Sequence, residues 1–473
     1  MANQSQKFLK RYRWKELGLF IIPFIILLLI MFQLPLAQYY ETQLRSNKSQ
    51  VPLTLSILPT IHDLIPIIGL IVALFLVNIT ISFFYPKADQ VLLPLAGLMS
   101  GIGVMMATRL GPNAGDPNLG TRQLAWVLIG LVACLATLFV LRRMGWLRNY
   151  KYIWAALGIF LVALTLIHAL KVKNFDSPNH DQLNFGPFSL QPSELLKIII
   201  VIFFAAYLDE TTRDVFAGSS RRIGPIPVPP LDKLGVLGLM LGISLLLFLG
   251  IRELGLALLI YGIFLTMLYL GSGKISYVVV GLLVFFVLGY IGYLIFGYVR
   301  ARFAAVTIDA VNWQNWTQAT VDYVNSLGGP RQVLEGLIAL ANGGILGSGI
   351  ALGHPGFVPV VQSDMIFTGL GEELGLAGLF AIIGIYMLII YRGYRIAIEA
   401  SNDFSQLLAA GLTSIFAIQS LVIMAGNMKF LPLTGIPLPF LSYGGSSVIA
   451  NFIIVGILLR ISHNTAMERE GLA

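Results

Sequence analysis

The chain has 473 residues, of which 57% are hydrophobic and only 11% are charged. Soluble globular proteins carry roughly 25% charged residues, so this composition excludes a water-soluble enzyme and indicates a polytopic membrane protein. The 31 basic against 23 acidic residues give a net charge of +8, which in a membrane protein reflects basic cytoplasmic loops rather than nucleic-acid binding.

Twelve apolar stretches are long enough to cross a membrane. They cover residues 17–37, 62–84, 92–108, 123–141, 152–171, 194–208, 234–250, 254–271, 275–298, 365–391, 407–428 and 446–462. The first follows the basic run KFLKRYRWK and lacks a small-residue cleavage site, which predicts a retained anchor rather than a signal peptide. We therefore expect an all-α helical bundle of about 12 transmembrane helices.

Basic residues predict the orientation of this bundle. With the N-terminus inside, 19 Lys and Arg residues fall in inner segments and 11 in outer segments, and Lys197 lies within a span. Because basic residues concentrate on the cytoplasmic side, both termini are predicted to be cytoplasmic. The outer face then carries residues 172–193, the large outer loop 299–364 and residues 429–445, so the chemistry is expected there.

Two charged pairs occur near the outer ends of the central spans. Glu194 and Lys197 are three residues apart and share one helix face. A charge in the hydrocarbon costs about 2.5–3.5 kcal/mol, so this pair predicts a site; alternatively, both lie near the interface and Lys197 reaches outward. Arg252 and Glu253 occupy the short hairpin before span 254–271, where a local ion pair is the simpler interpretation.

Further carboxylates begin the span 365–391. Asp364 and Glu372 are eight residues apart, which predicts that they lie on nearly the same helical stripe. A buried carboxylate without a partner would become neutral, so ionised carboxylates need a neighbouring cation. The predicted partners are Lys197, Arg252 and Lys429.

Two outer stretches are apolar yet unsuited to a regular span. Residues 333–353 contain six glycines and predict a re-entrant or interfacial element, because irregular backbone at membrane depth must line a cavity or be covered by protein. Residues 429–447 contain three prolines, Gly-Gly and paired serines. Their length and apolar content favour a packed lining over a mobile linker.

Little in the sequence points to metal or nucleotide chemistry. The single cysteine, Cys134, excludes an intrachain disulfide, and the five histidines lack the spacing of zinc ligands. Neither GxGxxG nor GxxxxGK[ST] occurs, which argues against a nucleotide-driven pump.

Four motifs together resemble the SEDS family (shape, elongation, division and sporulation), to which FtsW and RodA belong. They are QPSELLK (residues 191–197), GGILGSGIALG (343–353, hereafter the Gly-rich segment), PVVQSDMIF with GEELGLAG (359–378), and LPLTGIPLPFLSYGGSS (431–447). The resemblance covers ten of the twelve spans. It divides the chain into residues 1–91, with two extra helices, and a ten-helix core, residues 92–473.

This resemblance implies a peptidoglycan glycosyltransferase that polymerises lipid II at the outer face of the bacterial cytoplasmic membrane, in elongation or division. A class B penicillin-binding protein is the implied transpeptidase partner, and membrane lipids surround the protein. Cations would bind the lipid diphosphate through charge-assisted bonds; no cofactor is implied, although a divalent cation at the diphosphate is compatible. The residues expected to bind substrate are Glu194, Lys197, Arg252, Glu253, Arg331, Gln332, Asp364, Glu372, Ser446 and Ser447.

The expected catalytic position departs from the family pattern. Members usually carry an aspartate in a D-P-x-G-x-G-Y-Q pattern before the Gly-rich segment, whereas this chain has NSLGGPRQ and places Asn325 there. An amide can position a hydroxyl but cannot take its proton. Asp322 lies three residues earlier and is the predicted general base, with Asp309 farther back.

Two other family positions differ, because Glu253 stands for an aspartate and Asp181-Gln182 for Arg-Trp. Three functions therefore stay open. The protein is a lipid II polymerase with a relocated carboxylate, a noncatalytic scaffold or regulator of a cell-wall complex, or a flippase or transporter of lipid-linked precursors.

Overall fold

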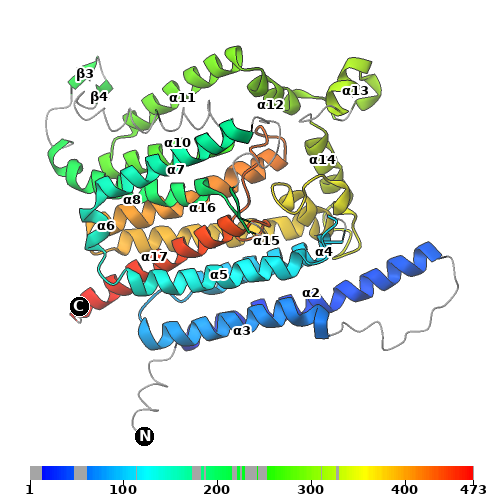
Figure 1. Ribbon diagram of the computed structural model, residues 1–473, viewed down its shortest axis with the longest axis horizontal. Coiled ribbons are helices and arrows are strands. Elements are labelled where there is room, and N and C mark those ends of the chain that lie inside the picture. Colours follow the sequence, from blue (N-terminus) through cyan, green and yellow to red (C-terminus); the bar gives the residue numbers. More distant parts are fainter. Residues whose placement is uncertain are drawn as a thin grey trace, which may run out of the picture. The chain divides into compact units, whose positions relative to one another are not determined.

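The computed structural model describes residues 13–46, 61–112, 114–172, 183–185, 188–215, 221–223, 226–228, 242, 253–310, 312–325 and 330–471. These residues are almost wholly helical (Figure 1). The helices are α2 (Trp14–Ser46), α3 (Ile61–Phe84), α4 (Leu92–Leu110), α5 (Leu119–Val140), α6 (Gly145–Asn149), α7 (Lys151–Val172), α8 (Pro192–Val215), α10 (Leu254–Ser272), α11 (Ile275–Ile295), α12 (Gly297–Thr307), α13 (Gln318–Asn325), α14 (Arg331–Gly343), α15 (Ile366–Glu399), α16 (Asp403–Asn427) and α17 (Gly445–Arg469).

The strands form two short antiparallel hairpins. β1 (Leu183–Phe185) pairs with β2 (Phe188–Leu190), and β3 (Arg221–Ile223) pairs with β4 (Ile226–Val228). Two 3-10 turns, η3 (Trp313–Asn315) and η4 (Pro355–Phe357), complete the described elements. The predicted all-α class is confirmed.

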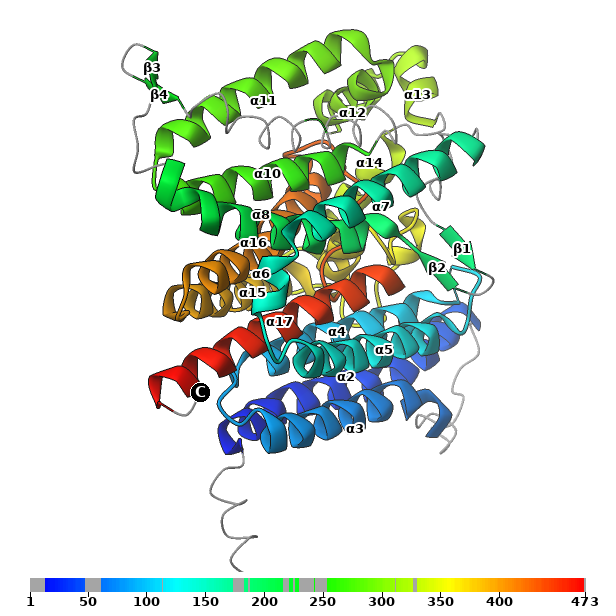
Figure 2. The same ribbon diagram turned by 60° about the vertical axis from the view of Figure 1, so that its left-hand side comes forward.

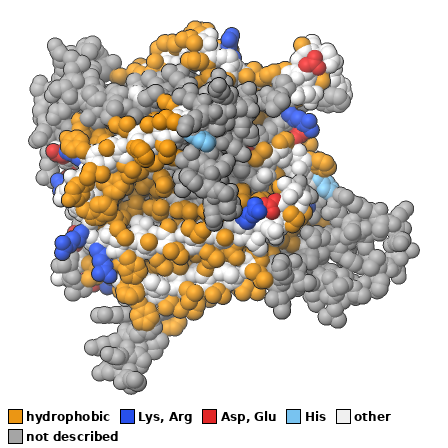
Figure 3. Space-filling view, in the orientation of Figure 1, with side chains coloured by type: hydrophobic (Ala, Val, Ile, Leu, Met, Phe, Trp, Pro, Cys, Tyr) orange, Lys and Arg blue, Asp and Glu red, His pale blue; other side chains and the backbone are white. Residues whose placement is uncertain are grey.

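Ten described helices are long and apolar enough to cross a membrane. They coincide with ten of the twelve predicted spans. The predicted span 194–208 lies within α8, whose charged residues at both ends lower its mean hydropathy, and the span 234–250 lies outside the described residues. Figure 3 shows hydrophobic side chains over most of the described surface in that view, as expected for a membrane protein.

The chain folds as two compact units. Unit 1 comprises residues 1–142, 335–392 and 437–473, and unit 2 comprises residues 143–334 and 393–436. The Pro-rich stretch 429–447 therefore contributes to both units.

Unit 1 is built on close contact between α5 and α17, with α2, α3 and α4 beside them (Figure 1). Glycines make this contact possible, because a Cβ at Gly130 would overlap the ring of Phe452 and one at Gly456 would lie 2.8 Å from the Cys134 carbonyl. The two N-terminal helices pack on α4 and α5. They are thus an integral part of this unit.

Unit 2 has α8, α10 and α16 at its centre, with α7 packed on α8 and α11 on α10 (Figure 2). Gly411 lets α16 approach α8 and α10, because a Cβ there would lie 2.7 Å from Val201 and from Met267. By contrast, α11 is the least enclosed span, with Tyr277 and Gly292 its buried residues. It leaves a broad apolar surface.

Candidate functional site

Helix α15 is broken at Gly375, and the Gly-rich segment fills the break. Gly375 has φ 66°, which interrupts the helix and leaves backbone groups of both halves unpaired. The Leu376 and Ala377 N–H groups donate to carbonyls of the Gly-rich segment (2.9 and 3.0 Å), and N–H groups of that segment donate to the carbonyls of Glu372 and Glu373 (2.9 and 3.1 Å). This pairing is what a re-entrant element needs at membrane depth.

Both glutamates of the break have fixed partners in unit 1. Glu373 forms an ion pair with Arg109 (3.4 Å between Nε and Oε1), and Arg109 also donates to the carbonyls of Ala351 and Gly353 (3.2 and 3.0 Å). Glu372 accepts from the backbone N–H of His354 (3.0 Å). A guanidinium supplies several donors in a fixed fork, so Arg109 joins α4, α15 and the Gly-rich segment.

The sequence analysis did not identify Arg109. It is the last basic residue of α4 and is buried, so a single charge at the end of an apolar span was the available signal. The ion-pair partner of Glu373 is Arg109, which was not among the cations predicted for the carboxylates of this span.

Asp364 does not share a helical stripe with Glu372, contrary to the prediction. It lies in the turns before α15, which begins at Ile366. Its backbone N–H is bound by the Ser363 hydroxyl (2.6 Å). The turn residues 359–365 replace the helical turn that the eight-residue spacing assumed.

In unit 2, Glu194 and Lys197 form the predicted pair on one face of α8. Their side chains are 2.6 Å apart and enclosed, and the Lys197 ammonium also donates to the Gln419 side chain (2.9 Å). The alternative in which Lys197 reaches outward is wrong, because its side chain is 0% exposed. The prediction that Asp364 or Glu372 lies nearby concerns unit 1 and stays a prediction.

The predicted catalytic residues lie on α13 in the outer loop. Asp322 and Asn325 are both exposed and, three residues apart, share one helix face. The Asp322 carboxylate accepts from Gln318 (3.0 Å). Between them Tyr323 donates its hydroxyl to the Ala301 carbonyl (2.7 Å), which ties α13 to α12, and burial raises the pKa of its phenol.

Asp309 serves the loop that connects α12 and α13. Its carboxylate accepts from the backbone and side chain of Asn312 (3.1 and 2.6 Å), and its carbonyl accepts from the Trp316 indole (2.8 Å). These bonds account for the acidic residue as a turn former.

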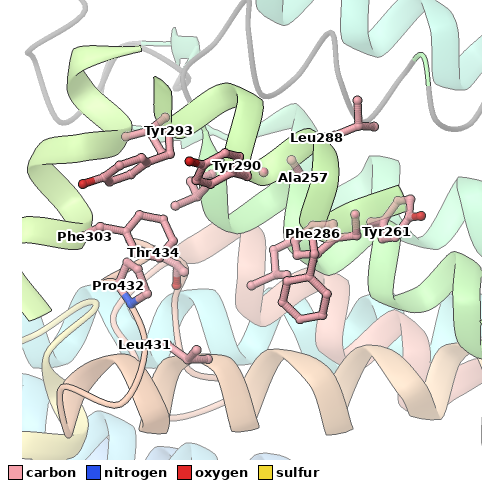
Figure 4. Close-up of a pocket in the computed structure, with 15 residues that line it drawn as sticks. Ala257, Tyr261, Phe286, Leu288, Tyr290, Tyr293, Phe303, Leu431, Pro432 and Thr434 are labelled. Atoms are coloured by element: carbon pink, nitrogen blue, oxygen red, sulfur yellow. The ribbon is translucent and has the colours of Figure 1, made fainter. Parts of the chain in front are cut away.

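An apolar cavity of about 620 Å³ opens in unit 2 (Figure 4). Its walls are α10, residues 285–293 of α11, the start of α12 and residues 431–434. Aromatic side chains dominate the lining, and Tyr293 meets Phe303 edge to face at 5.9 Å. The lining residues are Leu254, Ala257, Leu258, Tyr261, Phe285, Phe286, Leu288, Gly289, Tyr290, Tyr293, Val299, Phe303, Leu431, Pro432 and Thr434.

Three cations lie close along the chain to residues that line this cavity, and none of them was predicted there. Arg300 and Arg302 lie on α12 between the lining residues Val299 and Phe303. Arg302 donates to the Leu433 carbonyl (3.2 Å), and Lys429 donates to the Ile308 carbonyl. The run YVRAR directly after an apolar span was the signal that could have identified the arginines.

The other predicted substrate residues are distributed over both units. Arg331 and Gln332 begin α14 in unit 2, whereas Ser446 and Ser447 lie in the first turn of α17 in unit 1. Glu253 directly precedes α10. Arg252 lies outside the described residues.

The described part of the chain contains no group of three His, Cys, Asp or Glu side chains that could hold a metal ion. The arrangement thus offers positive charge, an apolar cavity and the exposed carboxylates of Asp309 and Asp322.

Known proteins are similar to this chain in sequence and in fold. The model of the cell cycle protein family FtsW, RodA and SpoVE matches residues 89–467. Peptidoglycan glycosyltransferase RodA of Mycobacterium leprae is 34% identical over 400 residues, covering 82% of this chain and 80% of that protein. Stage V sporulation protein E of Bacillus subtilis is 29% identical over 344 residues, covering 72% and 86%.

Solved structures agree in fold. A structure described as coordinating polymerization and crosslinking in a peptidoglycan synthase complex aligns with a TM-score of 0.59 and 23% identity, covering 80% of this chain and 98% of that chain. The rod shape determining protein RodA of Thermus thermophilus aligns with a TM-score of 0.53 and 21% identity, covering 80% and 97%. This multi-pass membrane protein belongs to the FtsW, RodA and SpoVE family of cell cycle proteins.

Proposed function

We propose that this protein is a peptidoglycan glycosyltransferase that polymerises lipid II at the outer face of the bacterial cytoplasmic membrane. The apolar cavity of unit 2 carries the proposal. Its aromatic walls suit a polyprenyl chain, and the neighbouring cations suit a diphosphate. A polyprenyl diphosphate combines a long apolar chain with an anionic head, which matches an apolar cavity with cations near it.

We assign parts of the substrate to parts of unit 2. The polyprenyl chain occupies the cavity between α10 and α11, and the diphosphate meets Arg300, Arg302 and Lys429 at its border. The sugars then lie over the outer loop. There Asp322 is the general base that takes the proton of the attacking hydroxyl, a contribution worth about 10²–10⁴-fold.

The orientation of the chain is part of the proposal, with both termini cytoplasmic and residues 299–364 outside. We test it with single cysteines in a Cys134→Ser background. A membrane-impermeant thiol reagent added to intact cells should label Gln318→Cys and leave Gly218→Cys unlabelled. The reverse pattern would invert the topology.

The proposed partner is a class B penicillin-binding protein, which would crosslink the strands as they are made. The solved synthase complex, which shares the fold, supports this assignment. Co-purification of the two proteins from membranes tests it, and recovery of this chain without a transpeptidase would contradict it.

The decisive assay supplies purified protein with lipid II and separates the glycan strands by length. The proposal expects strands from the wild-type protein. A noncatalytic scaffold is the alternative, which Asn325 at the family's aspartate position favours. An inactive wild type that gains polymerisation on Asn325→Asp would support that alternative, and movement of lipid II across vesicles without polymerisation would support a flippase.

A further inference from the structure

An ion pair links α4 to α15 at each end of α4. At one end the α4 side supplies the acid, and at the other end it supplies the base. At its start, the buried Asp89 pairs with Arg392 and also accepts from two backbone N–H groups of the first turn (2.8 and 3.0 Å). At its other end, Arg109 pairs with Glu373. About 20 helical residues, or roughly 30 Å, separate the two ion pairs.

Residues of the N-terminal helices contact the first of these ion pairs, the one between Asp89 and Arg392. Arg13, directly before α2, is buried and pairs with Glu16 (2.7 Å). Its guanidinium also donates to the carbonyls of Tyr85 (3.2 Å) and Asp89. The side chain of Asn78 in α3 donates to Glu16 (2.7 Å). Arg13 thus binds the same residue that forms the ion pair to α15.

The same two helices also pack along α4. A Cβ at Gly101 would overlap Leu27 of α2, and a Cβ at Gly97 would lie 2.9 Å from Leu74 of α3. Glycines four residues apart form a flat helix face that allows close approach of a neighbour. α4 is therefore shaped to receive the N-terminal helices.

The far end of α4 controls a strained backbone. Ala351 has φ 63°, in the left-handed region that alanine rarely adopts and that surrounding contacts must hold in place. Arg109 supplies one of those contacts by donating to the Ala351 carbonyl. A shift of α4 would weaken it.

We propose that α2 and α3 brace α4. Through Arg109, α4 then holds the Gly-rich segment in the conformation that is hydrogen-bonded to α15. Arg13 and Asp89 are then positioning residues for an element at the opposite end of the helix. α2 and α3 precede residues 89–467, which the family model matches, so both helices of the brace lie outside that match. It goes beyond the proposed function, since it concerns the conformation of the segment and needs no catalysis.

Hydrogen exchange of the full-length protein in lipid nanodiscs tests the brace. Arg13→Met should accelerate exchange of the Ser348 and Gly349 amides by about tenfold, a local opening at a remote position. Lys87→Met is the matched control, since it breaks an exposed ion pair with Glu470 in the same unit, and it should leave those amides unchanged.

A second, independent perturbation covers the case in which Arg13→Met does not fold. Gly101→Ala pushes Leu27 away from α4 without touching any charge, and it should accelerate the same amides. If Gly101→Ala exchanges like the wild-type protein at Ser348 and Gly349, the brace is overturned. Faster exchange confined to α2 and α3 would equally overturn it, because the N-terminal helices would then be attached only locally.

Discussion

The two glutamates at the break in α15 and the single aspartate of α13 differ in what surrounds them. Glu372 and Glu373 are buried and bound by a backbone N–H and a guanidinium, whereas Asp322 is exposed and accepts from a glutamine. Removing the partner of a buried carboxylate is costly, because the remaining charge is then buried without compensation. An exposed carboxylate is free to take a proton from a substrate. We therefore expect a structural role for Glu372 and Glu373 and a chemical role for Asp322.

Removing the buried guanidinium of Arg109 should have the largest effect on folding. Arg109→Met leaves Glu373 buried without its partner, which costs about 3–5 kcal/mol of unfolding free energy. Thermal unfolding in detergent measures it. Arg122→Met is the control, because it breaks an exposed pair with Asp116 and should cost less than about 1 kcal/mol. Equal midpoints for both variants would refute the structural role of Arg109.

Removing the exposed carboxylate should affect turnover and leave folding intact. Asp322→Ala is expected to lower lipid II polymerisation by about 10²-fold with an unchanged unfolding midpoint, and Asn325→Asp should match or exceed the wild-type rate. Asp116→Ala, another carboxylate of an extramembrane loop, is the control. Full activity in Asp322→Ala would move the base to Asp309 or Glu253.

Filling the cavity should have a smaller effect, on binding alone. Gly289 lines the cavity and has open space where a Cβ would stand. The side chain of Gly289→Leu would therefore fill space that the polyprenyl chain is proposed to occupy, without a clash with the protein. We expect KM for lipid II to rise about tenfold with kcat unchanged, the signature of lost uniform binding. Gly384→Leu places the same side chain in open space on α15 and should change neither constant. A fall in kcat alone would contradict the assignment.

The spans and the Glu194–Lys197 pair could be predicted because hydropathy and helical spacing are local properties of the sequence. The partner of Glu373 could not, since Arg109 is distant along the chain and meets it only after α4 and α15 pack. The prediction that Asp364 and Glu372 share a helical stripe was wrong, because Asp364 lies in the turns before the helix begins.

The cavity could not be predicted from the sequence either. α10 and α11 are apolar on all sides, so no pattern distinguishes a wall of the cavity from a surface that faces lipid. The family resemblance supplied the function, whereas the placement of Arg300 and Arg302 beside the cavity came from the packing of α12.

The central claim is that the cavity of unit 2 holds the lipid chain of the substrate. Lipid II with a photoreactive group on its polyprenyl chain tests it most directly, with crosslinked peptides identified by mass spectrometry. We predict crosslinks to Phe286 and Tyr290 of α11, lost in Gly289→Leu and retained in Gly384→Leu. Crosslinks confined to α2 and α3, and insensitive to Gly289→Leu, would contradict the account.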